Sequence, residues 1–479
     1  MADAYITRRG GGASDVVNAV VQECLAQTGT IDANTFVEFC GSLTASDPET
    51  LEFGNTPVAS SDIWCIRDAV VYGEYVVVFM GFKGSGYAYG VLASSIKFSN
   101  GTATIINTIV VKESNSSVSS ADMPIVGVAF PEKGQLVAYF LKTVQILYIN
   151  NGYLSLGSKA SIPSTADWEK QEELSILKVS SDKFIVSHGS NSYNAGRCCY
   201  CCTITSQNTI TVGTKYQITS YYASSGPMVN LGNNLFGIFI TTGTKASDLS
   251  ITGYTLSFDS DGTITQVSSQ KLQGIVGVSQ LYVRLYAVTL IENKKFAITF
   301  SDSLYTNKQP IFGVVVFEFD SSNNVFNAGK ITLVDDYFQS SSNSANNHYV
   351  NIAKIKNNRI LMSYPVQNRQ LGSFTVFGFN CIEGYISGLT IRFSEPLLLE
   401  FYINQTDRGA AVAFENKFII FGQNVTNYTG SSMTSKINSF IVVTPSELKI
   451  KKAEASIDGL LQSTATTTFK GKVAMLGGE

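Results

Sequence analysis

Short hydrophobic runs separated by turn-forming residues recur along most of the chain, and residues 281–334 show the pattern most clearly. The runs in this stretch are Tyr286 to Leu290, Phe296 to Phe300, Val314 to Phe319 and Ile331 to Val334. All four are short and rich in β-branched and aromatic residues, which favours strands over helices. Turn-forming residues separate the members of each pair, so the stretch predicts two hairpins, and together a four-stranded antiparallel sheet.

The same unit recurs along the chain. Turns like that of the first hairpin occur at residues 72–75, 132–136, 182–184, 233–235, 358–360 and 416–418. Turns like that of the second hairpin follow Phe98, Ile149, Ile204, Phe258, Cys381 and Val443. The two sets alternate without a break, and with residues 281–334 each has seven members. The period of roughly 50 to 60 residues is typical of repeat folds.

Each unit is apolar on both faces of its sheet, and radial packing of the sheets buries both faces. We therefore predict an all-β fold, a seven-bladed β-propeller of four-stranded antiparallel blades at residues 61–452, with short N- and C-terminal appendages. A parallel β-helix needs shorter and more regular coils. Only Leu141-Lys142-Thr143 separates the middle strands of the second unit, so a count of six or eight blades stays open.

The predicted appendages differ from the repeats in pattern. Residues 1–60 are interpreted as an N-terminal attachment segment and linker. In it, Ser14 is predicted to cap a short helix that includes Val21 and Cys24, and Thr35 to Cys40 a strand, whereas Pro48 to Pro57 looks like a linker. Residues 453–479 are predicted to form a C-terminal β-hairpin-like tail.

Composition narrows the function classes. Charged residues make up 15% of the chain and the net charge is −3, so no basic surface is predicted to bind nucleic acid. No apolar run is long enough for membrane insertion, and the polar N-terminus predicts no signal peptide.

The chain has eight cysteines, four of which flank Tyr200 in a predicted strand. Adjacent strand residues point to opposite faces, so the four residues Cys198, Cys199, Cys201 and Cys202 are interpreted as buried free thiols. This interpretation predicts that the protein folds in a reducing compartment. A metal or redox role is the alternative.

No catalytic constellation emerges from the sequence, and we predict a protein that is not an enzyme. There are two histidines, His188 and His348, and neither lies in a nucleophile-elbow context. No motif indicates a cofactor, a nucleotide or a metal ion. A glycan hydrolase needs only two carboxylates at a suitable separation. The candidates for that alternative are Asp122, Asp167, Glu169, Asp335, Asp336 and Asp407.

The lengths of the connections predict a binding face. Links within each hairpin are tight turns, whereas links between the middle strands and between blades are mostly longer, and a propeller gathers these longer links on one side. They are rich in Tyr, Asn, Ser and Gly, a mixture suited to adaptable recognition. The candidate ligand-binding residues are Tyr193, Tyr221, Tyr222, Tyr305, His348, Tyr349, Tyr402 and Tyr428.

The two ends of the chain, MADAYITRRGG and IDGLLQSTATTTFKGKVAML, resemble the ends of tail or tail-fibre-associated proteins of bacteriophages and prophages. The resemblance covers about 30 of the 479 residues. It implies a virion location after folding in the host cytoplasm, other virion tail proteins as partners, a homo-oligomer in the particle, and a body that faces the host.

Three functions follow as hypotheses. The first is a virion tail or fibre component whose long-loop face binds a host-surface polysaccharide or a neighbouring virion protein. The second is a glycan depolymerase on a propeller scaffold. The third is a structural connector or decoration protein without a ligand.

Overall fold

The computed structural model describes most of the chain. The described residues are 21–53, 63–83, 89–99, 102–114, 125–140, 142–163, 174–189, 196–219, 223–224, 226–242, 250–272, 281–304, 311–334, 350–356, 358–371, 374–404, 409–429, 432–447, 449–453 and 459–475. Within these ranges the chain is built of β-strands, with a single 3-10 turn at Pro131–Lys133. In this part of the chain no helix is long and apolar enough to cross a membrane.

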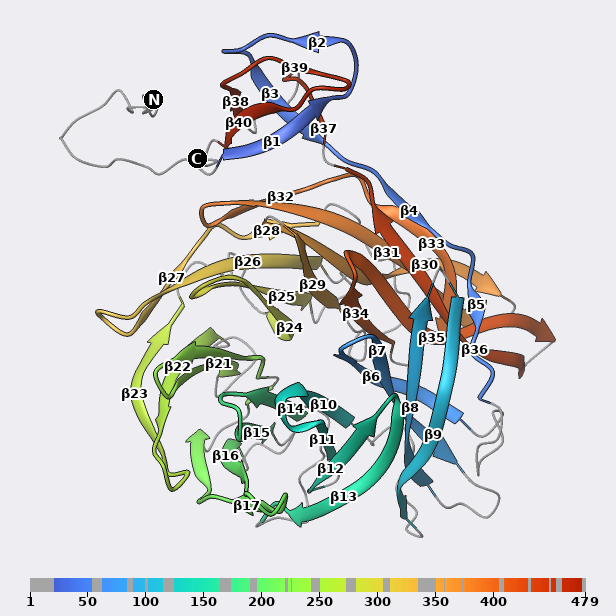
Figure 1. The fold of residues 1–479 in the computed structure, drawn as a ribbon, viewed down its shortest axis with the longest axis vertical. Helices are drawn as coiled ribbons and strands as arrows, with labels where there is room; N and C mark the ends of the chain where they lie inside the picture. Colours follow the sequence, from blue (N-terminus) through green and yellow to red (C-terminus); the bar gives the residue numbers. More distant parts are fainter. Residues whose placement is uncertain are drawn as a thin grey trace.

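Antiparallel sheets of four or five strands follow one another along the chain (Figure 1). The first contains β6 (Ile63–Tyr72), β7 (Tyr75–Lys83), β8 (Tyr89–Ser99) and β9 (Thr102–Ser114). The second contains β10 (Ile125–Phe130), β11 (Gln135–Phe140), β12 (Thr143–Asn150) and β13 (Tyr153–Ser161). The third contains β14 (Leu174–Lys178), β15 (Lys183–Gly189), β16 (Arg197–Ile204), β17 (Ile210–Val212) and β18 (Tyr216–Thr219).

The next three sheets repeat this order. The fourth contains β19 (Ala223–Ser224), β20 (Met228–Gly232), β21 (Leu235–Thr242), β22 (Ser250–Phe258) and β23 (Ile264–Lys271). The fifth contains β24 (Leu281–Glu292), β25 (Lys295–Leu304), β26 (Ile311–Asp320), β27 (Val325–Ala328) and β28 (Thr332–Leu333). The sixth contains β29 (Asn351–Lys356), β30 (Arg359–Leu371), β31 (Phe374–Ser387), β32 (Thr390–Phe393) and β33 (Leu397–Asn404).

The last sheet joins the two ends of the chain. It contains β34 (Ala410–Phe414), β35 (Lys417–Thr429) and β36 (Ser432–Pro445), completed by β4 (Leu43–Ala45) and β5 (Glu49–Thr50) from the N-terminal part. The innermost strands β6, β10, β14, β20, β24, β29 and β34 contact one another in this order, and β34 contacts β6. The sheets thus form a closed ring (Figure 1).

This arrangement is a β-propeller, and the all-β class predicted from the sequence is confirmed. The described residues contain seven such sheets. The count of seven blades for the whole chain remains a prediction from the sequence repeats.

The hydrophobic core lies between neighbouring sheets, as expected for units that are apolar on both faces. Phe79 on β7 and Leu147 on β12 share one cluster, and Phe239 on β21 shares another with Phe296 and Phe317 of the fifth sheet. Each interface therefore buries side chains of two sheets, and neither sheet can bury that surface alone.

Side-chain amides also tie the outer strands of neighbouring sheets together. Asn107 on β9 accepts the N–H of Leu154 at 2.9 Å and donates to the Leu154 carbonyl at 3.1 Å. Gln270 on β23 makes the same pair of bonds with Phe326 on β27, at 2.9 and 3.2 Å. Each amide binds the backbone N–H and C=O of one residue on an outer strand, groups that would otherwise be open to pairing with another chain.

The prediction that the last blade takes its fourth strand from the segment after Val443 was wrong. The segment that starts at Val443 was expected to turn back as a hairpin, but Val443 pairs with Ala45 and Ser439 pairs with Thr50. The free edge of β36 is thus filled by the N-terminal strands, which closes the ring with non-local pairing. Residues 49–53 are therefore not a linker: Leu51 and Phe53 are buried at this junction.

The two predicted appendages are also corrected, because they form one unit. The strands β1 (Val21–Ala26), β3 (Phe36–Cys40), β37 (Lys449–Lys452), β38 (Gly459–Leu461) and β40 (Gly471–Met475) close into a small barrel. A short pair, β2 (Thr30–Ile31) and β39 (Ala465–Thr466), extends it.

The predicted helix is wrong at Val21 and Cys24, which lie in β1, and residues 1–20 lie outside the described residues. The predicted strand at residues 35–40 is confirmed as β3. The barrel packs against the sixth sheet (Figure 1). Tyr385 of this sheet lies in the barrel's core cluster, and the centroids of its ring and the Phe39 ring are 5.8 Å apart.

Candidate binding surfaces

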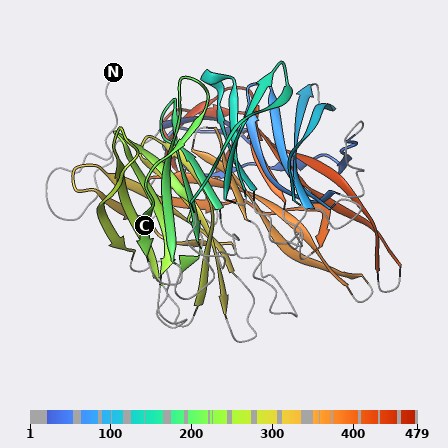
Figure 2. The same cartoon turned by 90° about the horizontal axis from the view of Figure 1, so that it is seen from below.

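Among the described residues, the middle strands of the last two sheets form the longest hairpins. β30 and β31 stay paired as far as Leu371 and Phe374, and β35 and β36 as far as Thr429 and Ser432. Figure 2 shows these hairpins extending beyond the ring on one side. The links between middle strands were predicted to be mostly longer connections, but most of the segment from Gln423 to Lys436 is paired strand, so this surface is built on backbone hydrogen bonds.

The opposite side of the ring carries the tight turns. There the backbone adopts the left-handed region at residues such as Asn233, Asn234, Lys294 and Asn358. Asn tolerates this conformation, which suits two-residue hairpin turns. The turn chemistry of the sequence therefore separates a tight-turn side from a side that carries the links between middle strands.

Two of the eight candidate ligand-binding residues lie in described strands. Tyr402 is in β33 and Tyr428 is in β35. Strand β33 pairs with β31 and also contacts β35, so it bridges the two long hairpins. The other candidates lie outside the described residues: Tyr193, Tyr221, Tyr222, Tyr305, His348 and Tyr349. The same holds for the candidate acids Asp122, Asp167, Glu169, Asp335, Asp336 and Asp407.

His188 is buried near the end of β15. Its Nδ1 lies 2.7 Å from the hydroxyl of Tyr139 on β11, and its Nε2 lies 3.1 Å from Sγ of Cys198 on β16. The ring of Tyr200 stacks on the imidazole, with the two ring centroids 5.9 Å apart. This polar cluster joins the second and third sheets. Sequence reasoning missed it because it depends on a contact between sheets.

The cysteines around Tyr200 alternate between the faces of the third sheet, as predicted. Cys198 and Cys202 face the second sheet, and Cys199 and Cys201 face the fourth. All eight cysteines of the chain are free thiols. Burial raises the pKa of Cys199 and of Cys201 to about 11, which disfavours the reactive thiolate.

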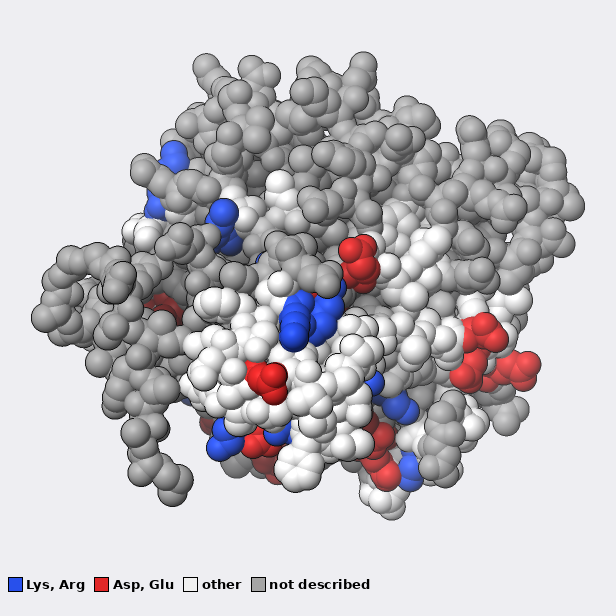
Figure 3. Space-filling model, turned by 90° about the horizontal axis from the view of Figure 1, so that it is seen from above, with Lys and Arg blue, Asp and Glu red and all other residues white. Residues whose placement is uncertain are grey.

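Charge does not single out a surface on the end of the molecule that the barrel occupies. Figure 3 shows basic and acidic side chains mixed among uncharged ones on the described part of that face. Among the residues with described positions, no group of three His, Cys, Asp or Glu side chains could hold a metal ion.

Asp68 is a carboxyl in a buried environment within the ring. It lies on the innermost strand β6 of the first sheet, and Oδ2 accepts the N–H of Gly127 on β10 at 2.7 Å. Oδ1 accepts the N–H of Ala69 at 2.9 Å. Burial raises the pKa of the Asp68 carboxyl to about 7, although the two N–H groups act in the opposite direction.

This carboxyl predicts a pH dependence of stability. Its pKa is higher in the folded protein than the value of about 3.9 in an unfolded chain, so the folded state binds more protons between these values. Stability should therefore fall as pH rises from about 4 to 7, by on the order of 1 to 3 kcal/mol from this group. Urea denaturation of the wild type and Asp68→Asn at acidic and slightly alkaline pH measures it. An equal pH dependence in both proteins would contradict the assignment.

The fold and these surfaces define a β-propeller that carries a terminal β-barrel and long hairpins on one side. No family model and no curated protein matches the sequence. Among solved structures, the chain is similar to Sqt1 of Saccharomyces cerevisiae, with 11% identity, a TM-score of 0.45 and coverage of 86% of this chain and 99% of that chain.

Two other similar structures are propellers by their descriptions. One is the β-propeller domain of the Trilobed protease from Pyrococcus furiosus, with 8% identity, a TM-score of 0.37 and coverage of 82% of this chain and 99% of that one. The other is the six-bladed lectin of Aleuria aurantia, with 10% identity, a TM-score of 0.39 and coverage of 70% and 97%. At these identities the likeness is one of fold.

Proposed function

We propose that this chain is a binding module that uses the projecting hairpins β30–β31 and β35–β36, with β33 between them, to engage a polysaccharide on a cell surface. The observation that carries the proposal is the pairing of these strands, interrupted only by β-bulges, as far as the ends of the projecting hairpins. A paired hairpin loses little further backbone entropy on binding, so it presents side chains at lower cost than a flexible loop does.

The composition of the hairpins supports this function. The segment from Gln423 to Lys436 contains Asn, Ser, Thr and Tyr and a single charged residue, Lys436. Short hydrogen-bonding side chains and an aromatic ring suit a ligand that offers hydroxyl groups and apolar C–H faces. The resemblance of the chain ends to phage tail proteins suggests the setting, a virion component whose barrel attaches to neighbouring tail proteins and whose hairpins face the host.

Tyr402 and Tyr428 provide the test. The full chain is applied to an array of immobilised bacterial cell-surface polysaccharides, and the Tyr402→Ala and Tyr428→Ala variants are compared with it. We expect at least one polysaccharide to be bound and the affinity to fall by about tenfold in either variant, the size of an aromatic hot spot.

Tyr153→Ala is the matched control. Tyr153 is 62% exposed on β13, the outer strand of the second sheet. Its replacement removes an exposed tyrosine away from the hairpins and should leave binding unchanged. An equal loss in the control, or no loss in the hairpin variants, would remove the hairpins as the binding surface.

A further inference from the structure

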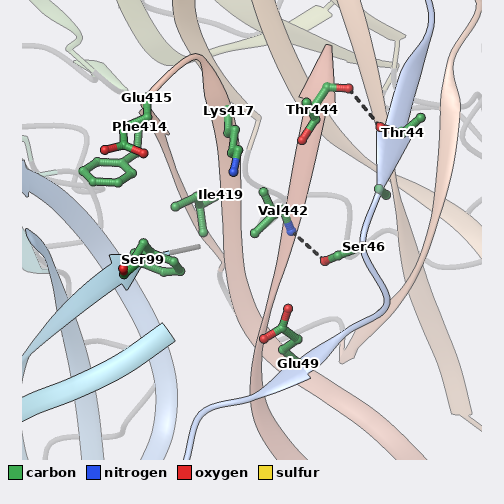
Figure 4. Close-up of a pocket in the computed structure, with 12 residues that line it drawn as sticks. Thr44, Ser46, Glu49, Ser99, Phe414, Glu415, Lys417, Ile419, Val442 and Thr444 are labelled. Carbon is green, nitrogen blue, oxygen red and sulfur yellow. Dashed lines mark hydrogen bonds between the residues drawn. The ribbon is translucent and has the colours of Figure 1, made fainter. Parts of the chain in front are cut away.

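A cavity of about 250 Å³ opens at the ring seam, which we define as the contact between the first sheet and the last sheet with its strands β4 and β5. Its walls come from β4, β5, the end of β8, the β34–β35 turn and β36 (Figure 4). The end of β8 and the β34–β35 turn both belong to the tight-turn side of the ring. The cavity is therefore on the side opposite to the projecting hairpins.

The base of the cavity is apolar and partly aromatic. The half-buried ring of Phe98 packs against the rings of Phe414 and Phe440, with centroid distances of 6.0 Å and 5.3 Å. The side chains of Ile419 and Val442 continue this surface. These residues come from both sheets of the ring seam, so the base exists only when the ring is closed.

Three charged side chains line the cavity: Glu49, Glu415 and Lys417. Figure 4 shows Glu49 on the N-terminal strand, across from Glu415 and Lys417 at the β34–β35 turn. Within the described part of the chain, none of the three makes an ion pair or a side-chain hydrogen bond. Elsewhere on the tight-turn side, glutamates pair with lysines, as Glu74 does with Lys97 at 2.8 Å. At the ring seam both charge types are available to a ligand.

The backbone at Glu415 lies in the left-handed region. Its φ is +47°, and it is the one acidic residue with a positive φ among the described residues, most of the others being Asn. A long acidic side chain is disfavoured in this region, and such strain tends to occur at functional positions. The turn thus keeps a carboxylate beside the cavity where Asn would suit the backbone better.

We propose that this cavity binds a single uncharged sugar ring. The apolar C–H face of the ring would lie on Phe98 and Phe414, and its hydroxyls would donate to Glu49 and Glu415 and accept from the Lys417 ammonium. The cavity volume equals that of about eight water molecules, which is room for one six-membered ring with its hydroxyls. The site is separate from the hairpins and does not depend on their function.

A ligand here would also stabilise the closed ring. It would connect Glu49 of the N-terminal strand with the β34–β35 turn, and these elements come from opposite ends of the chain. Because the cavity exists only in the closed ring, the ligand would bind the folded state alone and raise the melting temperature with its concentration.

The test uses the full chain and a panel of free monosaccharides: glucose, galactose, mannose and N-acetylglucosamine. Saturation-transfer NMR and a thermal shift are recorded for the wild type, Glu49→Gln and Glu415→Asn, with Glu74→Gln as the control on the same side of the ring. We expect at least one sugar to bind, and its Kd to rise by about tenfold or more in the two cavity variants only.

Glu415→Asn has a second readout. Because Asn tolerates a positive φ, this variant should melt at a higher temperature than the wild type while it loses the sugar. Lack of binding by any sugar of the panel, or equal affinity in the cavity variants, would overturn the proposal. Tyr428→Ala should keep sugar binding here, so failure of the hairpin proposal and failure of this one give different results.

Discussion

Replacing Glu383 by Ala is expected to lower the free energy of unfolding by about 3 to 5 kcal/mol, because it breaks a buried ion pair from one side. The Glu383 side chain is 1% exposed and pairs with Nε of Arg359, which is itself mostly buried. It also accepts a hydrogen bond from the Tyr385 hydroxyl at 2.9 Å. In the variant, the one hydrogen bond that the guanidinium keeps among the described residues is that to the Ser446 carbonyl, at 2.9 Å.

The loss should extend to the barrel. Tyr385 lies in the barrel core, and Glu383 fixes the position of its hydroxyl. Thermal and urea denaturation followed by circular dichroism measure the change, and a separate early transition would show that the barrel has lost its support on the sixth sheet. Glu74→Ala is the control, because its pair with Lys97 is exposed and exposed pairs contribute little. Similar losses in the two variants would contradict this account.

The repeats could be predicted from the sequence because their signals are local. Turn residues such as Asn233, Asn358 and Asn416 take the left-handed conformation that the hairpins require. The apolar runs between them become strands buried on both faces. Each signal lies within a few residues of the structure that it determines, so the propeller class follows without knowledge of distant contacts.

The ring closure and the barrel could not be predicted in this way. Strand β4 is only three residues long, and no local feature shows that Ala45 pairs with Val443 near the other end of the chain. The alternation in Lys449–Lys452 suits a strand equally well in the last sheet or in the barrel. Where a strand has two partners of similar chemistry, the choice depends on the whole fold.

The polar clusters between sheets were missed for the same reason. Cys198 lies opposite His188 in one hairpin, but Tyr139 comes from the neighbouring sheet. The cavity at the ring seam draws on segments from both ends of the chain, and neither Glu49 nor Glu415 lies in a recognisable motif. Contacts between blades depend on the angle at which the sheets pack, which hydrophobic patterns do not encode.

Replacing Phe239 by Ala is expected to lower the free energy of unfolding by about 3 to 5 kcal/mol, because it leaves a cavity between the fourth and fifth sheets. The side chain of Phe239 is fully buried. The centroid of its ring lies 5.4 Å from that of Phe296, 5.2 Å from that of Phe317 and 4.8 Å from that of Phe326, all on the fifth sheet. Chemical denaturation of the full chain measures the loss, with Leu290→Ala, at a side chain 54% exposed, as the control.

Gly253→Ala tests the same interface by adding volume instead of removing it. A Cβ at Gly253 would lie 2.9 Å from the Phe326 ring and 3.2 Å from the Phe239 ring, so one of the rings must move. We expect a loss of about 1 to 3 kcal/mol. Combined with Phe239→Ala the added methyl gains space, so the double variant should lose less than the sum of the two. Strict additivity would contradict the assignment of the glycine and the two rings to one packed interface.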